Sequence, residues 1–140
     1  MVNKTVRSIM RSRNACLSPK MSLDLVSNHL TQHHLPGAPV MDENYCPLGF
    51  VSEYDCLKQL MESAYYRDKT ALAEDVMATK LITTSPDLTL MDVASEMNTN
   101  RVNVAPVIEN GKIIGVLSRG DVMRELVNDL IEVQNAGISC

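Results

Sequence analysis

The sequence predicts a mixed α/β (α+β) fold, in which two tandem β-α-β-β-α units pack together as a pseudo-two-fold pair. The first observation is a repeated pattern, Gly-x-x-Ser-x-x-Asp, which occurs at Gly49–Asp55 and again at Gly115–Asp121. The second is a set of residues that recurs in the second half at one constant offset. Met10, Pro19, Leu23, Val26, Pro39 and Val40 recur as Met77, Pro86, Leu90, Val93, Pro106 and Val107. A shared pattern inside a shared framework indicates an internal duplication, so we expect both halves to adopt one fold.

The duplication also predicts the domain organisation. We expect a first unit over residues 1–66, a linker over 67–72, a second unit over 73–134 and a C-terminal tail over 135–140. The polar linker is too short to let the halves separate. A unit of about sixty residues with a small sheet covered on one face also leaves apolar surface over. The two units should therefore form one integrated module.

In the second half, turn and capping signals separate the elements. A Ser-Pro step ends a short apolar run, Thr89 begins a capping box, and Asn110-Gly111 is a strong hairpin signal. These signals predict a strand over Leu81–Ser85 and a helix from Thr89. They then predict antiparallel strands over Val102–Glu109 and Lys112–Ser118 and a last helix from Arg119 to about Glu132.

The first half predicts the same order of elements. They are expected over Ala15–Ser18, Ser22 to about Gln32, Gly37–Asp42 and Leu48–Ser52, followed by a helix through Leu57, Leu60 and Met61. The first copy carries one extra residue between its Pro-Val pair and its glycine. We expect this insertion to lie in a loop.

Composition and charge limit the classes of function that this chain can have. The net charge of −4 argues against general nucleic-acid affinity, since binding to phosphate backbones needs an excess of Lys and Arg. The basic exception is the N-terminal segment with Lys4, Arg7, Arg11, Arg13 and Lys20. No hydrophobic run approaches membrane-spanning length, and the cysteines form no Cys-x-x-Cys pair. We therefore expect a cytoplasmic protein with reduced cysteines and no membrane partner.

The motifs together resemble a known family. A tandem of short units, each with Met-x(8)-Pro, a Pro-Val strand and Gly-apolar-apolar-Ser-x-x-Asp, is similar to a CBS domain pair, also called a Bateman module. The resemblance covers about Val6 to Leu130 and is nearly continuous over Ala105–Asp121. The first copy is looser, with Tyr45-Cys46-Pro47 where a Gly-Lys-Leu-like turn is typical. The resemblance implies a stand-alone regulatory module without enzymatic activity or a required cofactor.

The resemblance also implies a ligand. Such modules bind adenosine-containing molecules, here AMP, ADP, ATP, NAD or S-adenosylmethionine, in clefts between the units. Asp121 and Asp55 would hold the ribose, with Ser118 and Ser52 nearer the phosphate. A carboxylate suits this role because it accepts hydrogen bonds from both ribose hydroxyls, and backbone N–H groups at a helix start favour an anion.

Each cleft should take residues from both halves. The Asp121 cleft is expected to face the segment from Arg11 to Cys16, and the Asp55 cleft the segment from Ala78 to Ile82. Phosphate candidates are Arg11, Arg13 and Arg119, with Lys80 as the weaker counterpart in the second cleft. Basic surroundings thus favour the Asp121 cleft.

The chain departs from the family where members that bind AMP often carry His or Arg before the apolar-Pro step. This chain has Pro36-Gly37 and Asn103-Val104 at these places. The departure leaves room for a neutral or cationic adenosyl ligand, or for none. Pro36 and Asn103 remain candidate contacts.

A second reading of the pattern needs no ligand. Ser-x-x-Asp before an apolar helix is also a helix cap. The alternative function is therefore a ligand-free dimerisation or scaffold module that acts through an unknown protein partner. In either case we expect a two-fold homodimer, the commonest form of oligomer. We expect no metal site at His29, His33 and His34, because no Cys or carboxylate at ligand spacing completes one.

Overall fold

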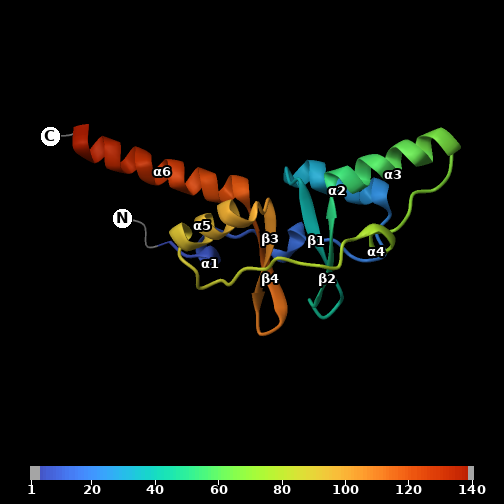
Figure 1. The fold of residues 1–140 in the computed structure, drawn as a ribbon, viewed down its shortest axis with the longest axis horizontal. Helices are drawn as coiled ribbons and strands as arrows, with labels where there is room; N and C mark the ends of the chain where they lie inside the picture. Colours follow the sequence, from blue (N-terminus) through green and yellow to red (C-terminus); the bar gives the residue numbers. More distant parts are fainter. Residues whose placement is uncertain (1–3, 139–140) are drawn as a thin grey trace.

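The computed structural model describes residues 4–138 and contains two β-hairpins. Strands β1 (Gly37–Met41) and β2 (Pro47–Ser52) form one antiparallel sheet, and β3 (Val104–Glu109) and β4 (Lys112–Ser118) form the other. Figure 1 shows the two hairpins side by side in the middle of the molecule, with helices on both sides. This arrangement confirms the mixed helix and sheet fold.

Each hairpin has one helix before it and one after it. Helices α2 (Leu23–His33) and α3 (Glu53–Tyr66) accompany the first hairpin, and α5 (Leu90–Asn100) and α6 (Arg119–Ile138) accompany the second. The predicted cap at Thr89 is confirmed, since its side chain accepts a hydrogen bond from the N–H of Asp92. The repeated helix–hairpin–helix order places the start of α3 and the start of α6 at equivalent points.

The predicted first strand of each unit is wrong in extent. The region of Ala15–Ser18 contains a 3₁₀ turn and one parallel bridge, Leu17 to Val40, and the region of Leu81–Ser85 contains one parallel bridge, Thr84 to Val107. In both regions a proline lies two residues after the bridge residue. Proline lacks the N–H that the next ladder bond requires, so pairing stops after one residue.

The hairpin turns explain the length difference between the copies. Asn110 and Gly111 form a two-residue turn with φ of 54° and 77°, the left-handed pair that such turns need. In the first copy the connection runs over residues 42–46, where the Asp42 carboxylate accepts from the N–H groups of Asn44 and Cys46 at 2.8 and 2.9 Å. The extra residue therefore lies in a loop, as expected.

Each unit begins with a short helix that the sequence did not predict. Helix α1 (Val6–Ile9) begins the first unit and α4 (Ala73–Val76) begins the second. Val6 is buried in the core of the second unit, and Ala73 is buried in the core of the first. Each half thus contributes its opening segment to the core of the other.

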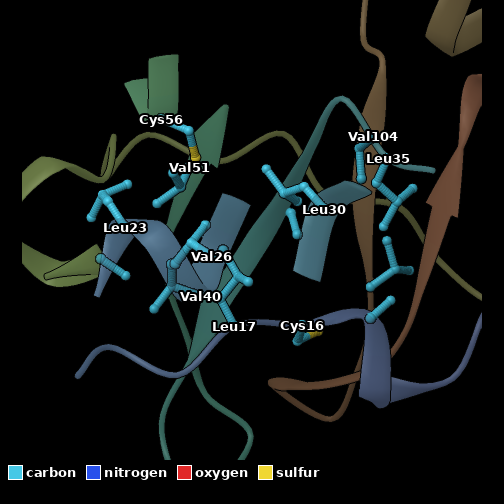
Figure 2. Packing of buried hydrophobic residues seen from close by; sticks show 14 of the residues in the cluster. Cys16, Leu17, Leu23, Val26, Leu30, Leu35, Val40, Val51, Cys56 and Val104 are labelled. Carbon is cyan, nitrogen blue, oxygen red and sulfur yellow. The ribbon is translucent and has the colours of Figure 1, made fainter. Parts of the chain in front are cut away.

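The larger core cluster also crosses between the units. Figure 2 shows side chains of the first unit, such as Leu30 and Leu35, packed close to Val104 from the second hairpin. Ile113 and Val116 of β4 belong to the same buried cluster. Because the units share core residues, they form one packed body. Within residues 4–138, no helix is both long and apolar enough to cross a bilayer.

Candidate functional site

The glycine of each repeated pattern lies where the opening segment of one half crosses the hairpin of the other. Arg11 exchanges two backbone hydrogen bonds with Val116, at 2.8 and 2.9 Å, and Ala78 does the same with Phe50. A Cβ atom on Gly115 would lie 2.5 Å from the carbonyl oxygen of Arg11. The glycine therefore permits the crossing that brings Arg11 to the start of α6.

Asp121 lies in the first turn of α6 and is only 7% exposed. Its backbone N–H donates to the Ser118 hydroxyl at 3.1 Å. Arg11 donates to both carboxylate oxygens, from Nε to Oδ2 at 2.8 Å and from Nη2 to Oδ1 at 3.2 Å, and Arg124 donates to Oδ1 at 3.2 Å. Two guanidinium groups thus hold one buried carboxylate.

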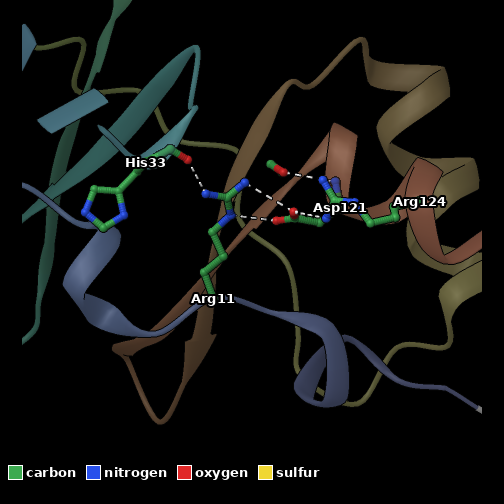
Figure 3. A network of polar contacts seen from close by, with 5 residues as sticks. Arg11, His33, Asp121 and Arg124 are labelled. Atoms are coloured by element: carbon green, nitrogen blue, oxygen red, sulfur yellow. Dashed lines mark hydrogen bonds and ion pairs between the residues drawn. The ribbon is translucent and has the colours of Figure 1, made fainter. Parts of the chain in front are cut away.

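Arg11 also contacts the first unit. Its Nη1 donates to the backbone carbonyl of His33, the last residue of α2. Figure 3 shows the guanidinium between this carbonyl and the Asp121 carboxylate. The carbonyl end of a helix carries partial negative charge, which favours a cation there. One side chain therefore joins the end of α2 to the start of α6.

The pKa of the Asp121 carboxyl reflects these contacts. Burial acts to raise the pKa, but hydrogen bonds from Arg11 and Ser118, together with the charge of Arg11, outweigh it. The result is a pKa below the ordinary value of 3.8. Asp121 is therefore a carboxylate at neutral pH and an acceptor for hydrogen-bond donors.

A cavity of about 540 Å³ lies between the units beside this network. Its walls come from the end of α2, the start of α3 and the start of α6. The charged lining residues are Arg11, Arg119, Arg124 and Glu53, an excess of positive charge. The remaining walls are formed by Leu30, Thr31, His34, Leu35, Pro36, Asn103, Ser118, Gly120 and Met123. The cavity thus combines cations, an apolar wall and a helix start.

The Asp55 side has the same backbone plan and different side-chain chemistry. Ser52 donates to Asp55 Oδ2 from its N–H and its hydroxyl, at 2.9 and 3.0 Å, and its Oγ accepts from the N–H of Asp55 at 3.2 Å. This is a complete capping box. Ala78 lies where Arg11 lies in the other copy, so no equivalent guanidinium reaches Asp55.

Two smaller cavities lie on the Asp55 side. One of about 440 Å³ is lined by Ser52, Tyr54, Leu57 and Phe50 and shares Pro36, Glu53, Asn103 and Arg119 with the larger cavity. The other, of about 170 Å³, is lined by Phe50, Ala78, Lys80, Leu81, Ile82, Val102, Val104 and Pro106. Pro36, Asn103 and Arg119 therefore face both sides of the pair.

Four predicted residues lie outside the lining of these cavities: Asp121, which lies behind Arg11, and Arg13, Cys16 and Asp55. The guanidinium of Arg13 stacks on the Tyr45 ring at 3.8 Å, and its Nε donates to the carbonyl of Ile113 at 2.7 Å. Cys16 is buried, and burial raises its thiol pKa to about 12. Asp55 is engaged in its cap. These side chains hold the hairpins and helices in place.

Arg124, Glu53 and His34 line the cavity although the sequence did not predict them as site residues. Arg124 lies three positions after Asp121, a helical neighbour, so this spacing signalled it. Glu53 is the counterpart of Arg119 in the repeat. His34 lines the cavity because it ends α2 in a left-handed conformation with φ of 54°, which no local pattern indicates. Among residues 4–138, no group of three potential metal-binding side chains comes together.

Comparison with known proteins identifies the family. The model of the CBS domain matches the chain twice, over residues 6–62 and 73–128. Because these matches cover most of the sequence, the chain belongs to the CBS domain family and contains two CBS domains in tandem.

Individual relatives are distant. An uncharacterised protein of Methanocaldococcus jannaschii is 23% identical over 91% of this chain, which spans 45% of that relative's length. The CBS domain-containing protein YhcV of Bacillus subtilis is 23% identical over 84% of this chain and 82% of its own length. The solved structure of CBSX2 of Arabidopsis thaliana in complex with AMP is 28% identical, with a TM-score of 0.71, and the match covers 90% of this chain and 98% of that one.

Proposed function

We propose that this CBS pair is a regulatory module, without catalytic activity of its own, that binds an adenosine-containing ligand between its two units at Asp121. The observation that carries the proposal is the cavity lined by Arg11, Ser118 and the start of α6, behind which the buried Asp121 carboxylate lies against Arg11. Asp121 suits a ribose because a carboxylate accepts from two adjacent hydroxyls. The AMP complex of CBSX2 supports this ligand class.

The charges of the cavity favour a ligand with phosphate. Arg119 and Arg124 are exposed at the start of α6, and Arg11 lies deeper, whereas Glu53 is the one carboxylate among the lining residues. Arginine binds phosphate strongly through charge-assisted hydrogen bonds. We therefore rank AMP, ADP, ATP and NAD above S-adenosylmethionine, although neither Pro36 nor Asn103 supplies a cation.

A thermal-denaturation screen with these five compounds tests the ligand class. A ligand at about 100 times its Kd stabilises the folded chain by about 2.7 kcal/mol, which raises the Tm by several degrees. We expect AMP or a larger adenine nucleotide to raise the Tm of the wild type. A flat response to all five compounds would contradict the proposal.

Matched variants locate the site. Asp121→Asn keeps the size of the side chain and removes its charge, so we expect a much smaller Tm response. Asp55→Asn makes the same change in the other copy, where the carboxylate serves the cap, and should keep the response. The reverse result would move the ligand to the Asp55 cleft.

The scaffold alternative is favoured by one observation, the complete capping box at Ser52 and Asp55. A cap of this kind stabilises a helix by about 1 kcal/mol without any ligand. If the whole pattern serves as capping, Asp55→Ala and Asp121→Ala should both lower stability while every ligand screen stays silent. The function would then reside in a protein partner.

We also propose a two-fold homodimer built on α3 and α6. Exposed apolar side chains follow one stripe of each helix: Tyr54, Leu57, Met61 and Tyr65 on α3, and Met123, Val127, Leu130 and Ile131 on α6. In the repeat, Leu57, Met61 and Tyr65 correspond to Met123, Val127 and Ile131. Figure 1 shows both helices along the same edge of the molecule. Apolar surface of this extent favours association. A cytoplasmic location remains a prediction.

A further inference from the structure

Arg11 occupies the place on Asp121 that a ribose would need. Its Nε and Nη2 both donate to the carboxylate, and Asp121 lies behind Arg11 while Arg11 itself lines the cavity. The Asp121 side chain is 9% exposed and that of Arg11 is 26% exposed. A ligand that enters the cavity therefore meets the guanidinium before it meets the carboxylate.

The same guanidinium is a tie between the units. Its third contact is the His33 carbonyl at the end of α2 in the first unit, whereas Asp121 begins α6 in the second. Arg124 also binds Asp121, but it belongs to the same helix and its side chain is 67% exposed. Of the two arginines on Asp121, only Arg11 joins the units.

The other copy of the repeat lacks this tie. Ala78 pairs with Phe50 as Arg11 pairs with Val116, and a methyl group stands where the guanidinium would begin. Asp55 turns back onto Ser52. The tie is therefore a feature of one cleft and not a requirement of the fold.

We propose that Arg11 is a latch that a ligand must open. This inference rests on the proposed function and adds how that site is regulated. A ribose that binds Asp121 displaces Arg11 from the carboxylate and from the His33 carbonyl, which frees α2 from α6. The released guanidinium stays beside the cavity and binds the ligand's phosphate, so an anionic nucleotide compensates the charge that a neutral nucleoside leaves unpaired.

The two possible roles of Arg11, as a latch and as a simple phosphate contact, predict different effects of its removal on ligand binding. Removing Arg11 frees Asp121 and at the same time removes a phosphate partner. We therefore expect Arg11→Ala to bind adenosine roughly tenfold more tightly than the wild type and AMP less tightly, because the cost of breaking the ion pair disappears with the guanidinium. A contact to phosphate alone would weaken AMP and leave adenosine unchanged.

Calorimetric titrations of adenosine and AMP into the full chain test the latch. The variants are Arg11→Ala, Arg11→Gln as a polar and uncharged second choice should the alanine variant fail to fold, and Arg124→Ala as the control for lost charge. Arg124→Ala should weaken AMP and leave adenosine within about twofold of the wild type, since an exposed ion pair contributes little.

The outcomes separate the latch from the ligand. Tighter adenosine binding in both Arg11 variants supports the latch, and so does adenosine binding that appears only once Arg11 is removed from a chain that binds AMP. If the wild type binds AMP and the Arg11 variants gain no affinity for adenosine, the latch is overturned and the proposed function stands. If neither the wild type nor an Arg11 variant binds either compound, the adenosine site and its latch both fail.

Discussion

The glycine of each repeated pattern has a steric role that the fold makes visible. A Cβ atom on Gly115 would meet the Arg11 carbonyl oxygen at 2.5 Å and the sulfur of Met10 at 2.6 Å. Gly49 faces the same clash with Ala78 and Met77. The crossing of the halves therefore requires glycine at both positions, whether or not a ligand binds.

We expect Gly115→Ala to lower the free energy of unfolding by about 2–3 kcal/mol, because a backbone carbonyl must move to make room. Gly120→Ala is the matched control, since its Cβ would meet nothing closer than 3.9 Å. That variant should be neutral or up to about 1 kcal/mol more stable, as alanine favours a helix. Chemical denaturation measures both. Equal stabilities for the two variants would show that the crossing tolerates a side chain.

Asp121 should also shape the acid stability of the chain. Its pKa is lowered in the folded state, so the unfolded chain binds more protons in acid. The resulting stabilisation is present above the ordinary carboxyl pKa of 3.8 and is lost as the pH falls below that value. Denaturation at several acidic pH values should show a steeper loss for the wild type than for Asp121→Asn. Parallel curves would mean that Asp121 gains nothing from Arg11.

The sequence predicted both Ser-x-x-Asp sites and both of their readings, as a cap and as a ligand site. It did not predict that Asp55 would turn to Ser52 while Asp121 turned to Arg11. That difference depends on which side chain the crossing segment brings in, arginine in one copy and alanine in the other. The residue types are local information, whereas their partners are set by tertiary structure.

Among the elements, the hairpins and long helices were predictable and the connections were not. Asn110-Gly111 and the cap at Thr89 are local signals that act within a few residues. The expected first strands reduce to single bridges because prolines interrupt the ladders, although Pro19 and Pro86 were visible in the sequence. Helices α1 and α4 have four residues each, too few to show a periodic pattern.

The exchange of opening segments predicts a long-range effect. Val6 is fully buried against the second unit, where Leu90 and Val93 belong to the same cluster. We expect Val6→Ala to lower the free energy of unfolding by about 2 kcal/mol through the cavity it leaves. Ser8→Ala, at an exposed position of the same helix, should cost less, because it removes only the exposed hydrogen bonds of that side chain with Thr5. Hydrogen exchange should show less protected amides in α5 of the Val6 variant. A loss of protection confined to the first unit would contradict the contribution of the opening segment to the second unit's core.

The apolar stripes of α3 and α6 should hold two copies of the chain together as a dimer. A charge placed in either stripe would be buried without a partner on association, which is costly. We expect Met61→Glu and Val127→Glu to convert a dimer to a monomer in light scattering. Asn128→Glu adds the same charge beside the stripe and should leave the dimer intact. A wild type that is monomeric at high concentration would contradict the assembly.

We propose that an adenosine-containing ligand binds between the two CBS units at Asp121. Isothermal titration of AMP into the wild type and Asp121→Asn tests this binding. We expect saturable binding to the wild type, with affinity reduced about tenfold or more in the variant, since a carboxylate is a stronger hydrogen-bond acceptor than an amide. Equal affinity in the two proteins, or no binding to the wild type, would contradict the claim.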